Sequence, residues 1–439
     1  MKVVIIGGGS AGTTCAFELR KLNKDVEIKI FEKSSHLEYS PCALPYVLSG
    51  EINSFDDIFI FKKQDYQEND IQLILNSVVT KIDRKHKRIV LADGSEESYD
   101  KLVFAAGSVS FVPQIKGLES TKFEVLKTID DAKSIKKALP KSKNIAVIGG
   151  GMIGVELAVS LAKKDKNVII IEACETILPN LLDKDISNIL KEYLNSNDIN
   201  VQTNAKIKSI SKNRLFLDDE TILFDQLIVC TGVKPSVELA KDAGLKVNKG
   251  IIVDEFLQTS DKNVFACGDC VESFECNSGE KILSQLGTTA VRQAKTIAKN
   301  ISGEKEEFPP VLNNTISRIG GFYIGSVGMT KRRADELAIE TVSARYTGNV
   351  RAEYYPSKEK ITIKLVCNES GILIGGQVIG HDEVVGRLDM IALAIQNRMN
   401  IREIANLETA YNPASAPIFD PLTITAELCL KKLNFLGKI

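Results

Sequence analysis

Two stretches of the chain share one pattern of hydrophobic and polar positions: an apolar run, a glycine cluster and then a helical period. The first is VVIIGGGSAGTTCAFEL at 3–19, and the second is IAVIGGGMIGVELAVSL at 145–161. In each copy a later apolar run ends in glutamate, IKIFE at 28–32 and VIIIE at 168–172. Short apolar runs that alternate with helical patterns predict βαβ units and a buried parallel sheet. The chain therefore contains an internal repeat.

The two copies also end alike. Turn signals between short strand-like runs lie at Asp93-Gly94 and Asp218-Asp219, and the closing apolar strands are KLVFAAG at 101–107 and QLIVCTG at 226–232. We therefore expect an α/β fold with two Rossmann-like domains.

The glycine clusters follow the G-x-G-x-x-G spacing of dinucleotide-binding loops. The first glycine permits a tight turn, the second lets a phosphate approach the backbone, and the third lets helix and strand pack closely. A pyrophosphate then lies at the helix N-terminus, where free N–H groups favour an anion. The glycines concerned are Gly7, Gly9 and Gly12 in copy one, and Gly149, Gly151 and Gly154 in copy two.

An acidic residue ends the next strand of each copy, Glu32 in the first and Glu172 in the second. At this position a carboxylate can accept hydrogen bonds from the adenosine ribose, and this is the role that we expect. The alternative for either residue alone is a solvated strand end. A carboxylate at Glu172 would also repel the 2′-phosphate of NADPH, and Ala173 and Cys174 supply no cation. We therefore favour NADH over NADPH.

Composition narrows the class of protein. The net charge is −1, so nothing resembles a nucleic-acid footprint. No apolar run approaches the ~20 residues of a membrane span, and the chain begins directly with a strand. We expect a cytoplasmic protein.

The nine cysteines are scattered, unlike a secreted disulfide framework. The only CxxC, Cys267 to Cys270, lacks a second pair or nearby histidines, so we predict no metal site.

Cys42 in YSPCALPYVLSG is the cysteine that we expect to be reactive. A helix-compatible stretch follows it, and the dipole at a helix N-terminus lowers the pKa of a thiol there. For most other cysteines we expect small buried hydrophobic residues; these are Cys15, Cys174, Cys230, Cys367 and Cys429.

The segment TSDKNVFACGDCVES, 259–273, resembles the second flavin fingerprint of the pyridine nucleotide-disulfide oxidoreductases. Further matches are GGGSAGTTCA, SPCALPY, GGGMIGVELA and CTGVKP, so the resemblance covers essentially the whole chain. It implies a glutathione-reductase type of fold with FAD on copy one, NADH or less favourably NADPH on copy two, and a C-terminal α+β dimerisation domain. The implied domains are 1–112 with 245–311 for FAD, 113–244 for NAD, and 312–439 for dimerisation.

The resemblance also implies individual contacts. Asp269 would hydrogen-bond the flavin ribitol, and the helix predicted at 286–301 would point its N-terminus at the flavin. The implied nucleotide-binding residues are Gly7, Gly9, Ser10, Ala11, Gly12, Glu32, Lys33, Ser40, Val79, Ala106, Gly107, Asp269, Gly287 and Thr288 for FAD, and Gly149, Gly151, Met152, Ile153, Gly154, Glu172 and Gly232 for NAD(P)H.

The chain is similar to the single-cysteine branch of this family. Enzymes of the glutathione-reductase type carry Cys-x4-Cys, whereas Val47 stands at the second position here. Cys42 would then cycle through a mixed disulfide with a small thiol or through a sulfenic acid. NADH peroxidases and water-forming oxidases carry a histidine where this chain has Ser10. Thiol-disulfide members place coenzyme A beside the first helix, which implies Thr14 and Lys21; for Lys21 the alternative is a solvated helix face.

In the family's dimerisation domain, tyrosines from the partner subunit reach the cysteine. The matching residues are Tyr354, Tyr355 and Tyr411, where a hydroxyl would protonate or orient a leaving thiolate. Relatives commonly read Tyr-Ala-Pro-Pro at the last site, whereas this chain reads Tyr-Asn-Pro-Ala. The alternative is that these tyrosines pack an interface.

The expected protein is a homodimeric FAD enzyme that passes electrons from NADH through Cys42 to a small disulfide or persulfide, most simply coenzyme A disulfide. One rival is an NADH oxidase or peroxidase, against which Ser10 in place of histidine weighs. A second rival is a flavin-bound redox sensor with little turnover.

Overall fold

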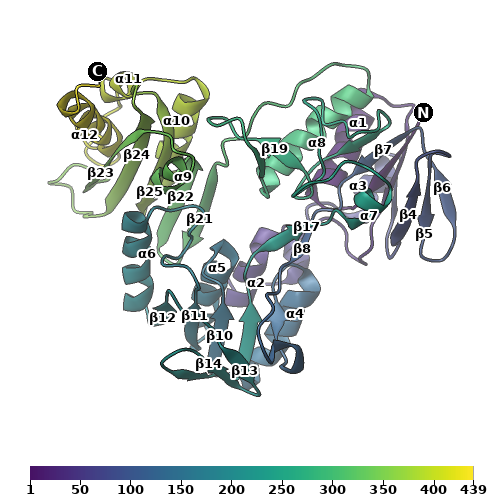
Figure 1. Cartoon of the computed structure of the whole chain (residues 1–439), viewed down its shortest axis with the longest axis horizontal. Coiled ribbons are helices and arrows are strands. Elements are labelled where there is room, and N and C mark those ends of the chain that lie inside the picture. The colour runs from purple at the N-terminus through teal and green to yellow at the C-terminus, as the bar shows by residue number, and fades with distance from the viewer. Residues whose placement is uncertain (439) are drawn as a thin grey trace. The chain divides into compact units, whose positions relative to one another are not determined.

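The computed structural model describes residues 1–438, and Figure 1 shows its helices and strands. The last residue of the expected dimerisation domain, 439, lies outside the described residues. The chain forms two compact units. The first contains Met1–Phe111, Lys127–Ile129 and Val233–Val311; the second contains Val112–Leu126, Asp130–Gly232 and the segment from Leu312 onward.

The first unit is built on a parallel five-stranded sheet with the order β18-β7-β1-β2-β3. Its strands are β1 (Lys2–Ile6), β2 (Glu27–Phe31), β3 (Ile71–Ile74), β7 (Lys101–Phe104) and β18 (Val264–Ala266). Strand β1 is buried from Val3 to Ile6, as its continuous apolar run predicts. Two helices, α1 (Ser10–Leu22) and α8 (Gly287–Ile301), pack against each other.

Smaller elements complete this unit. They are α2 (Leu44–Ser49), α3 (Lys63–Glu68) and α7 (Glu238–Asp242); the antiparallel strands β4 (Val79–Asp83), β5 (Arg88–Leu91) and β6 (Glu96–Ser98); and the pairs β8 (Ser108–Ser110) with β17 (Val233–Pro235) and β19 (Glu272–Phe274) with β20 (Lys281–Leu283). Because β17 pairs with β8, the chain re-enters the first unit at Val233, earlier than the expected boundary at 245.

The second unit repeats the parallel sheet, with the order β12-β11-β10-β16-β9. The strands are β9 (Glu124–Val125), β10 (Asn144–Ile148), β11 (Asn167–Ile171), β12 (Ile199–Gln202) and β16 (Gln226–Val229); the accompanying elements are α4 (Ile129–Ala138), α5 (Met152–Ala162), α6 (Lys184–Ser196) and the hairpin strands β13 (Ser209–Ser211), β14 (Arg214–Phe216) and β15 (Thr221–Leu223). In both sheets the first strand lies between the second strand and the closing strand, so the predicted repeat and the α/β fold class are confirmed.

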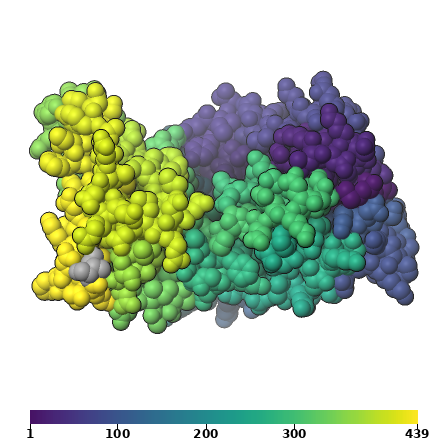
Figure 2. Space-filling model, turned by 90° about the horizontal axis from the view of Figure 1, so that it is seen from above, coloured from purple at the N-terminus to yellow at the C-terminus, as the bar shows by residue number. Residues whose placement is uncertain are grey.

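The C-terminal part of the second unit is an antiparallel sheet with the order β21-β22-β25-β24-β23 and four helices. The elements are β21 (Thr315–Ile319), β22 (Phe322–Gly328), β23 (Thr341–Asn349), β24 (Lys360–Asn368), β25 (Leu373–Gly380), α9 (Lys331–Glu336), α10 (Val384–Gln396), α11 (Ile401–Ala405) and α12 (Pro421–Phe435). Helix α12 packs on β23 and β24. Figure 2 shows this part, in light green to yellow, as a continuous stretch of surface.

A buried polar cluster joins the two sheets of the second unit. Asp183, 5% exposed, precedes α6 and accepts hydrogen bonds from Gln377 Nε2 at 2.8 Å and from the backbone N–H of Arg332 at 3.0 Å. Lys364 Nζ lies 2.9 Å from Asp183 and 2.7 Å from Asp185. The cluster therefore ties the parallel sheet to strands β24 and β25. The division into three domains that we expect from the sequence stays a prediction.

Within residues 1–438, no helix is both long and apolar enough to cross a membrane.

Replacing Asp183 by Asn should lower the free energy of unfolding by about 3 kcal/mol, because it leaves a buried lysine with one carboxylate partner fewer. Burial alone would raise the pKa of Asp183, but the Arg332 N–H and the Lys364 charge lower it overall. The contribution of Asp183 to the free energy of unfolding should therefore be present above about pH 4 and be lost as the pH falls further. Urea unfolding followed by circular dichroism measures both effects. The control Asp219→Asn changes an exposed turn residue, and an equal loss there would contradict the prediction.

Candidate functional site

The first glycine loop is tightly packed at two glycines and open at the third. Gly7 has φ +105°, and a Cβ there would lie 2.3 Å from the Ala105 carbonyl oxygen. A Cβ on Gly12 would lie 1.9 Å from the Gly7 oxygen, whereas one on Gly9 would meet no atom within 4 Å. Packing within the protein therefore explains Gly7 and Gly12, while the space beside Gly9 is open to a ligand.

The second loop has the same geometry. Gly149 has φ +109° with the Cys230 oxygen 2.4 Å from a built Cβ, and a Cβ on Gly154 would lie 2.1 Å from the Gly149 oxygen. A Cβ on Gly151 again meets nothing within 4 Å. The two copies thus present equivalent open positions at the starts of α1 and α5.

The acid of each copy braces its own glycine loop. Glu32 accepts hydrogen bonds from the N–H of Gly8 and the N–H of Ser34, each at 2.7 Å. Glu172 accepts from the N–H of Gly150 at 2.6 Å and the N–H of Cys174 at 2.7 Å. Each carboxylate thus fixes the loop at which a pyrophosphate would bind. Its ribose role stays a prediction.

Asp269 follows β18, as the flavin fingerprint implies, and is held by two residues that sequence reasoning missed. Its Oδ2 accepts from Ser108 Oγ at 2.6 Å and lies 3.3 Å from Lys127 Nζ. Gly268 has φ +81°, and its N–H donates to Gln293 Oε1 at 2.8 Å. Ser108 could have been predicted, because it directly follows the Ala106-Gly107 pair. Nothing in the sequence indicates that Lys127 contacts Asp269.

Helix α8 begins at Gly287, as expected, with no side-chain cap. Gly287 and Thr288 are exposed, so the N–H groups of the first turn are available to a negatively charged group. Together with the open position at Gly9 and the held carboxylate of Asp269, this donor set fits a dinucleotide with a flavin. The residues of the first unit therefore fit FAD.

The remaining nucleotide and substrate positions differ in how exposed they are. Lys33, Gly232 and Lys21 are exposed; Ser10, Thr14, Ser40, Val79, Ala106, Gly107, Met152 and Ile153 are partly buried; and Ala11 is buried. Lys21 forms an ion pair with Glu18 at 2.8 Å on α1, an arrangement consistent with the solvated face that we kept as its alternative. The binding roles of these residues stay predictions.

Cys42 lies in a short helical turn, Pro41–Ala43, that leads directly into α2. Its side chain is exposed, and the N–H of Ala43 donates to the Ser40 oxygen at 3.1 Å. Val47, at the position of a second redox cysteine, is 1% exposed. The structure thus presents one sulfur at the start of a helical segment.

The other cysteines differ from Cys42 in exposure. Burial raises the pKa of Cys15, Cys230 and Cys270 to about 12. Our expectation that Cys174 is buried was wrong, because its N–H binds Glu172 in the loop after β11 and its side chain is exposed. Partial burial and the neighbouring Glu172 nevertheless raise the pKa of Cys174.

Two of the three predicted tyrosines are in contact. The hydroxyls of Tyr354 and Tyr411 lie 2.7 Å apart, and both rings are exposed. Arg351 holds the two loops together, with its Nε donating to the Ala414 oxygen at 2.9 Å. The hydrogen bond to Tyr354 raises the pKa of Tyr411. Tyr355 is partly buried, and its backbone N–H donates to the Ala352 oxygen at 2.8 Å.

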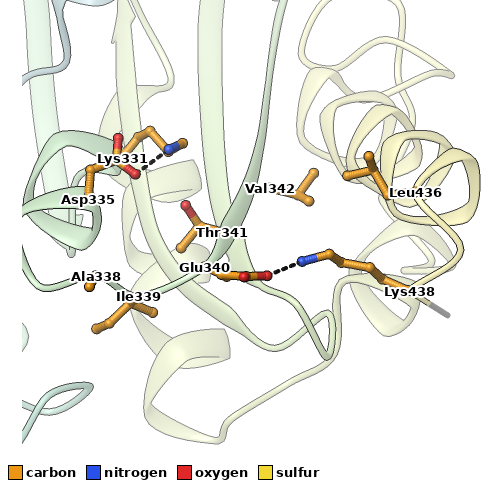
Figure 3. Close-up of a pocket in the computed structure, with 9 residues that line it drawn as sticks. All are labelled: Lys331, Asp335, Ala338, Ile339, Glu340, Thr341, Val342, Leu436 and Lys438. Atoms are coloured by element: carbon orange, nitrogen blue, oxygen red, sulfur yellow. Dashed lines mark hydrogen bonds and ion pairs between the residues drawn. The ribbon is translucent and has the colours of Figure 1, made fainter.

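A surface hollow in the second unit contains none of the predicted residues. Figure 3 shows it between the α9 segment and the chain's last helix, with the ion pairs Lys331–Asp335 and Glu340–Lys438 at its edge. In the described part of the chain, histidine, cysteine and acidic side chains form no cluster able to hold a metal ion.

Known proteins match the chain along its length. Residues 1–294 match the pyridine nucleotide-disulphide oxidoreductase family, and residues 320–421 match the family's dimerisation domain, which supports a homodimer. An NADH oxidase of Methanocaldococcus jannaschii is 40% identical over 99% of this chain and 100% of its own. An NAD(P)H coenzyme A polysulfide/persulfide reductase of Pyrococcus horikoshii is 31% identical over 97% and 98%. A solved NAD-dependent persulfide reductase from A. fulgidus has TM-score 0.95 and 32% identity, covering 99% of this chain and 84% of its own.

Gly9→Ala and Gly12→Ala should have opposite effects. Gly9 has φ −76° and open space, so alanine should leave the fold intact while displacing the pyrophosphate and reducing FAD content. Gly12→Ala should prevent folding, because its Cβ meets a carbonyl oxygen. Circular dichroism measures the fold, and the ratio of flavin to protein absorbance measures FAD content. Full FAD content in folded Gly9→Ala would contradict the assigned loop.

Proposed function

The chain belongs to the pyridine nucleotide-disulphide oxidoreductase family, and on that premise we propose that it reduces a small disulfide or persulfide through Cys42. It is an FAD-dependent NAD(P)H oxidoreductase. The observation that carries the substrate proposal is the exposed Cys42 at the start of a helical segment, in the unit whose residues fit FAD.

The first unit holds FAD in this proposal. The first glycine loop and the start of α1 bind the pyrophosphate, Glu32 receives the ribose, and Asp269 binds the ribitol chain. When bound, FAD accepts a hydride from the nicotinamide and passes two electrons to sulfur. Ser108 and Lys127 orient the Asp269 carboxylate, and the α8 N-terminus stabilises negative charge.

The second unit holds the nicotinamide nucleotide. Its glycine loop and α5 N-terminus bind the pyrophosphate, and Glu172 receives the adenosine ribose. Glu172 is 8% exposed and already accepts hydrogen bonds from two backbone N–H groups, so its carboxylate is held in a fixed place. A fixed carboxylate at this point disfavours the 2′-phosphate of NADPH.

Cys42 acts as the nucleophile. Its thiolate attacks one sulfur of the substrate, which forms a mixed disulfide and releases the other half as a thiolate. Two electrons and one proton then regenerate Cys42 and release the second thiol. Coenzyme A is the thiol that we propose, with Thr14 and Lys21 on α1 as its contacts and the tyrosines of a second subunit beside the leaving sulfur.

The second candidate function is an NADH oxidase, because the 40% identical relative bears that name. Ser10 weighs against it, since a serine cannot supply the base that a histidine would. Anaerobic assays of NADH consumption with coenzyme A disulfide, a persulfide or polysulfide distinguish this function when compared with turnover on O₂ and peroxide.

Cys42→Ser should abolish disulfide reduction while FAD stays bound, because it removes the nucleophile and leaves the glycine loops intact. Anaerobic NADH oxidation with coenzyme A disulfide measures turnover, and flavin absorbance measures FAD. Cys174→Ser is the matched control, since it removes the other exposed thiol among residues 1–438. Undiminished turnover of Cys42→Ser, or its loss of FAD, would refute the assigned role.

The kcat/KM should be higher for NADH than for NADPH, because Glu172 opposes a 2′-phosphate. Steady-state assays with the two coenzymes at one fixed disulfide concentration measure the ratio. A preference for NADPH would exclude the role given to Glu172.

A further inference from the structure

The short segment Lys127–Ile129, which we call the clasp, belongs to the first unit, although the residues on both sides of it belong to the second. The chain therefore enters the first unit for three positions and leaves it again. Within the clasp Ile129 is buried, Lys127 is partly exposed and Thr128 is exposed. So short a segment buries little apolar surface, and its effect on the site comes from its polar contacts.

One end of the clasp contacts the carboxylate of Asp269. Lys127 Nζ donates to Ser108 Oγ at 2.8 Å and lies 3.3 Å from Asp269 Oδ2. Ser108 Oγ donates to the same carboxylate oxygen at 2.6 Å, so the three polar atoms form a closed triangle. The side chains of Lys127 and Asp269 are 27% and 20% exposed, so their ion pair is partly shielded from water. This end of the clasp is therefore fixed at the carboxylate to which we assign the flavin ribitol.

The other end of the clasp contacts the loop that carries Cys42. Ile129 is the first residue of α4, and the N–H groups of the first turn of a helix have no acceptor inside the helix. The hydroxyl oxygen of Tyr39 accepts the hydrogen bond of the Ile129 N–H at 3.2 Å. Tyr39 lies three positions before Cys42 in the sequence. The same three-residue segment therefore contacts both the Asp269 carboxylate and the cysteine loop.

The cysteine loop has a second anchor on the segment that contains Phe59. Tyr39 forms an antiparallel bridge with Phe59, and the centroids of their rings lie 6.0 Å apart. The N–H of Ser40 donates to the Ile58 oxygen at 3.0 Å. Between Tyr39 and Cys42 there are only two residues, and the second is a proline, whose backbone φ is fixed. The position of Tyr39 therefore constrains the position of the sulfur.

We propose that the clasp ties Asp269 to the cysteine loop and so fixes the Cys42 sulfur relative to the carboxylate that binds the flavin; the proposal rests on the function proposed above. In that reaction two electrons and one proton reach the mixed disulfide of Cys42, the S–S bond breaks, Cys42 returns as a thiolate and the small thiol leaves. The rate of such a transfer depends steeply on how the reacting atoms are placed. Lys127 and Tyr39 are positioning residues, because they act through Asp269 and the cysteine loop.

The first test is Tyr39→Phe, which keeps the ring but removes the acceptor of the Ile129 N–H. Hydrogen exchange of the amides at 38–43, followed by mass spectrometry, should become about tenfold faster. In stopped-flow experiments NADH should reduce the flavin at the wild-type rate, whereas reoxidation by coenzyme A disulfide should be about tenfold slower. Tyr99→Phe is the matched control, because the buried Tyr99 hydroxyl has no hydrogen-bond partner among residues 1–438.

The second test is Lys127→Met, which distinguishes a clasp from two unrelated contacts. Release of the clasp at Asp269 should also speed hydrogen exchange at 38–43, and Lys127→Arg, which keeps a cation beside Asp269, should restore slow exchange. The same measurement on protein freed of FAD separates loss of the clasp from loss of the cofactor. Wild-type exchange at 38–43 in Lys127→Met, or wild-type exchange or reoxidation in Tyr39→Phe, would overturn the proposal.

The positioning role and the proposed function fail separately. If Cys42→Ser abolishes disulfide reduction while Tyr39→Phe and Lys127→Met match wild type in hydrogen exchange, only the positioning role is wrong. If Cys42→Ser retains disulfide reduction, the proposed function is wrong and the positioning role falls with it.

Discussion

The turn between the first strand and the first helix of each nucleotide unit is the constraint on which the site depends. At Gly12 and Gly154 a Cβ would lie 1.9 and 2.1 Å from the oxygen of the first glycine of the loop, so helix and strand meet without a side chain between them. The first glycine in turn lies against the carbonyl group just after the closing strand, which is that of Ala105 in the first unit and that of Cys230 in the second. Three segments therefore meet at one turn, where the strand order reverses and ligands of such sheets bind.

The same turn appears twice, so it does not by itself distinguish the two nucleotides. The difference lies in what is added beside the closing strand. In the first unit β18 pairs with β7 and brings Asp269 and the start of α8 to the loop. In the second unit the equivalent edge is occupied by β9, and the residues that follow this strand, Leu126, Lys127 and Thr128, include no acid at the place of Asp269. A returning segment of the chain, rather than the repeat, thus makes the first copy fit a flavin.

The features that sequence reasoning found are those that local backbone geometry requires. Gly7 and Gly12 must be glycine because a Cβ at either position would overlap a backbone oxygen. The turn that carries Cys42 and the helix that follows it are consecutive in the sequence. The features that it missed join distant segments: Lys127 reaches Asp269, and Lys364 pairs with Asp183. Such pairs leave no periodic signal in the sequence. The exposure of Cys174 was missed for a different reason, because Cys174 lies in the loop just after the buried end of β11.

Of the nine cysteines, all of which lie within residues 1–438, Cys42 and Cys174 are the two that are exposed. Burial raises the pKa of Cys15 and Cys230 to about 12, so these thiols remain protonated and shielded at neutral pH. Cys174 is exposed, but partial burial and the neighbouring Glu172 raise its pKa, which disfavours the thiolate. Cys42 is exposed at the start of a helical segment, and the residue five positions further is the buried Val47. An internal disulfide at that position would require a thiol where the core has an aliphatic side chain. Under the proposed function the second sulfur must therefore come from the substrate, which is why a small disulfide or persulfide suits this site.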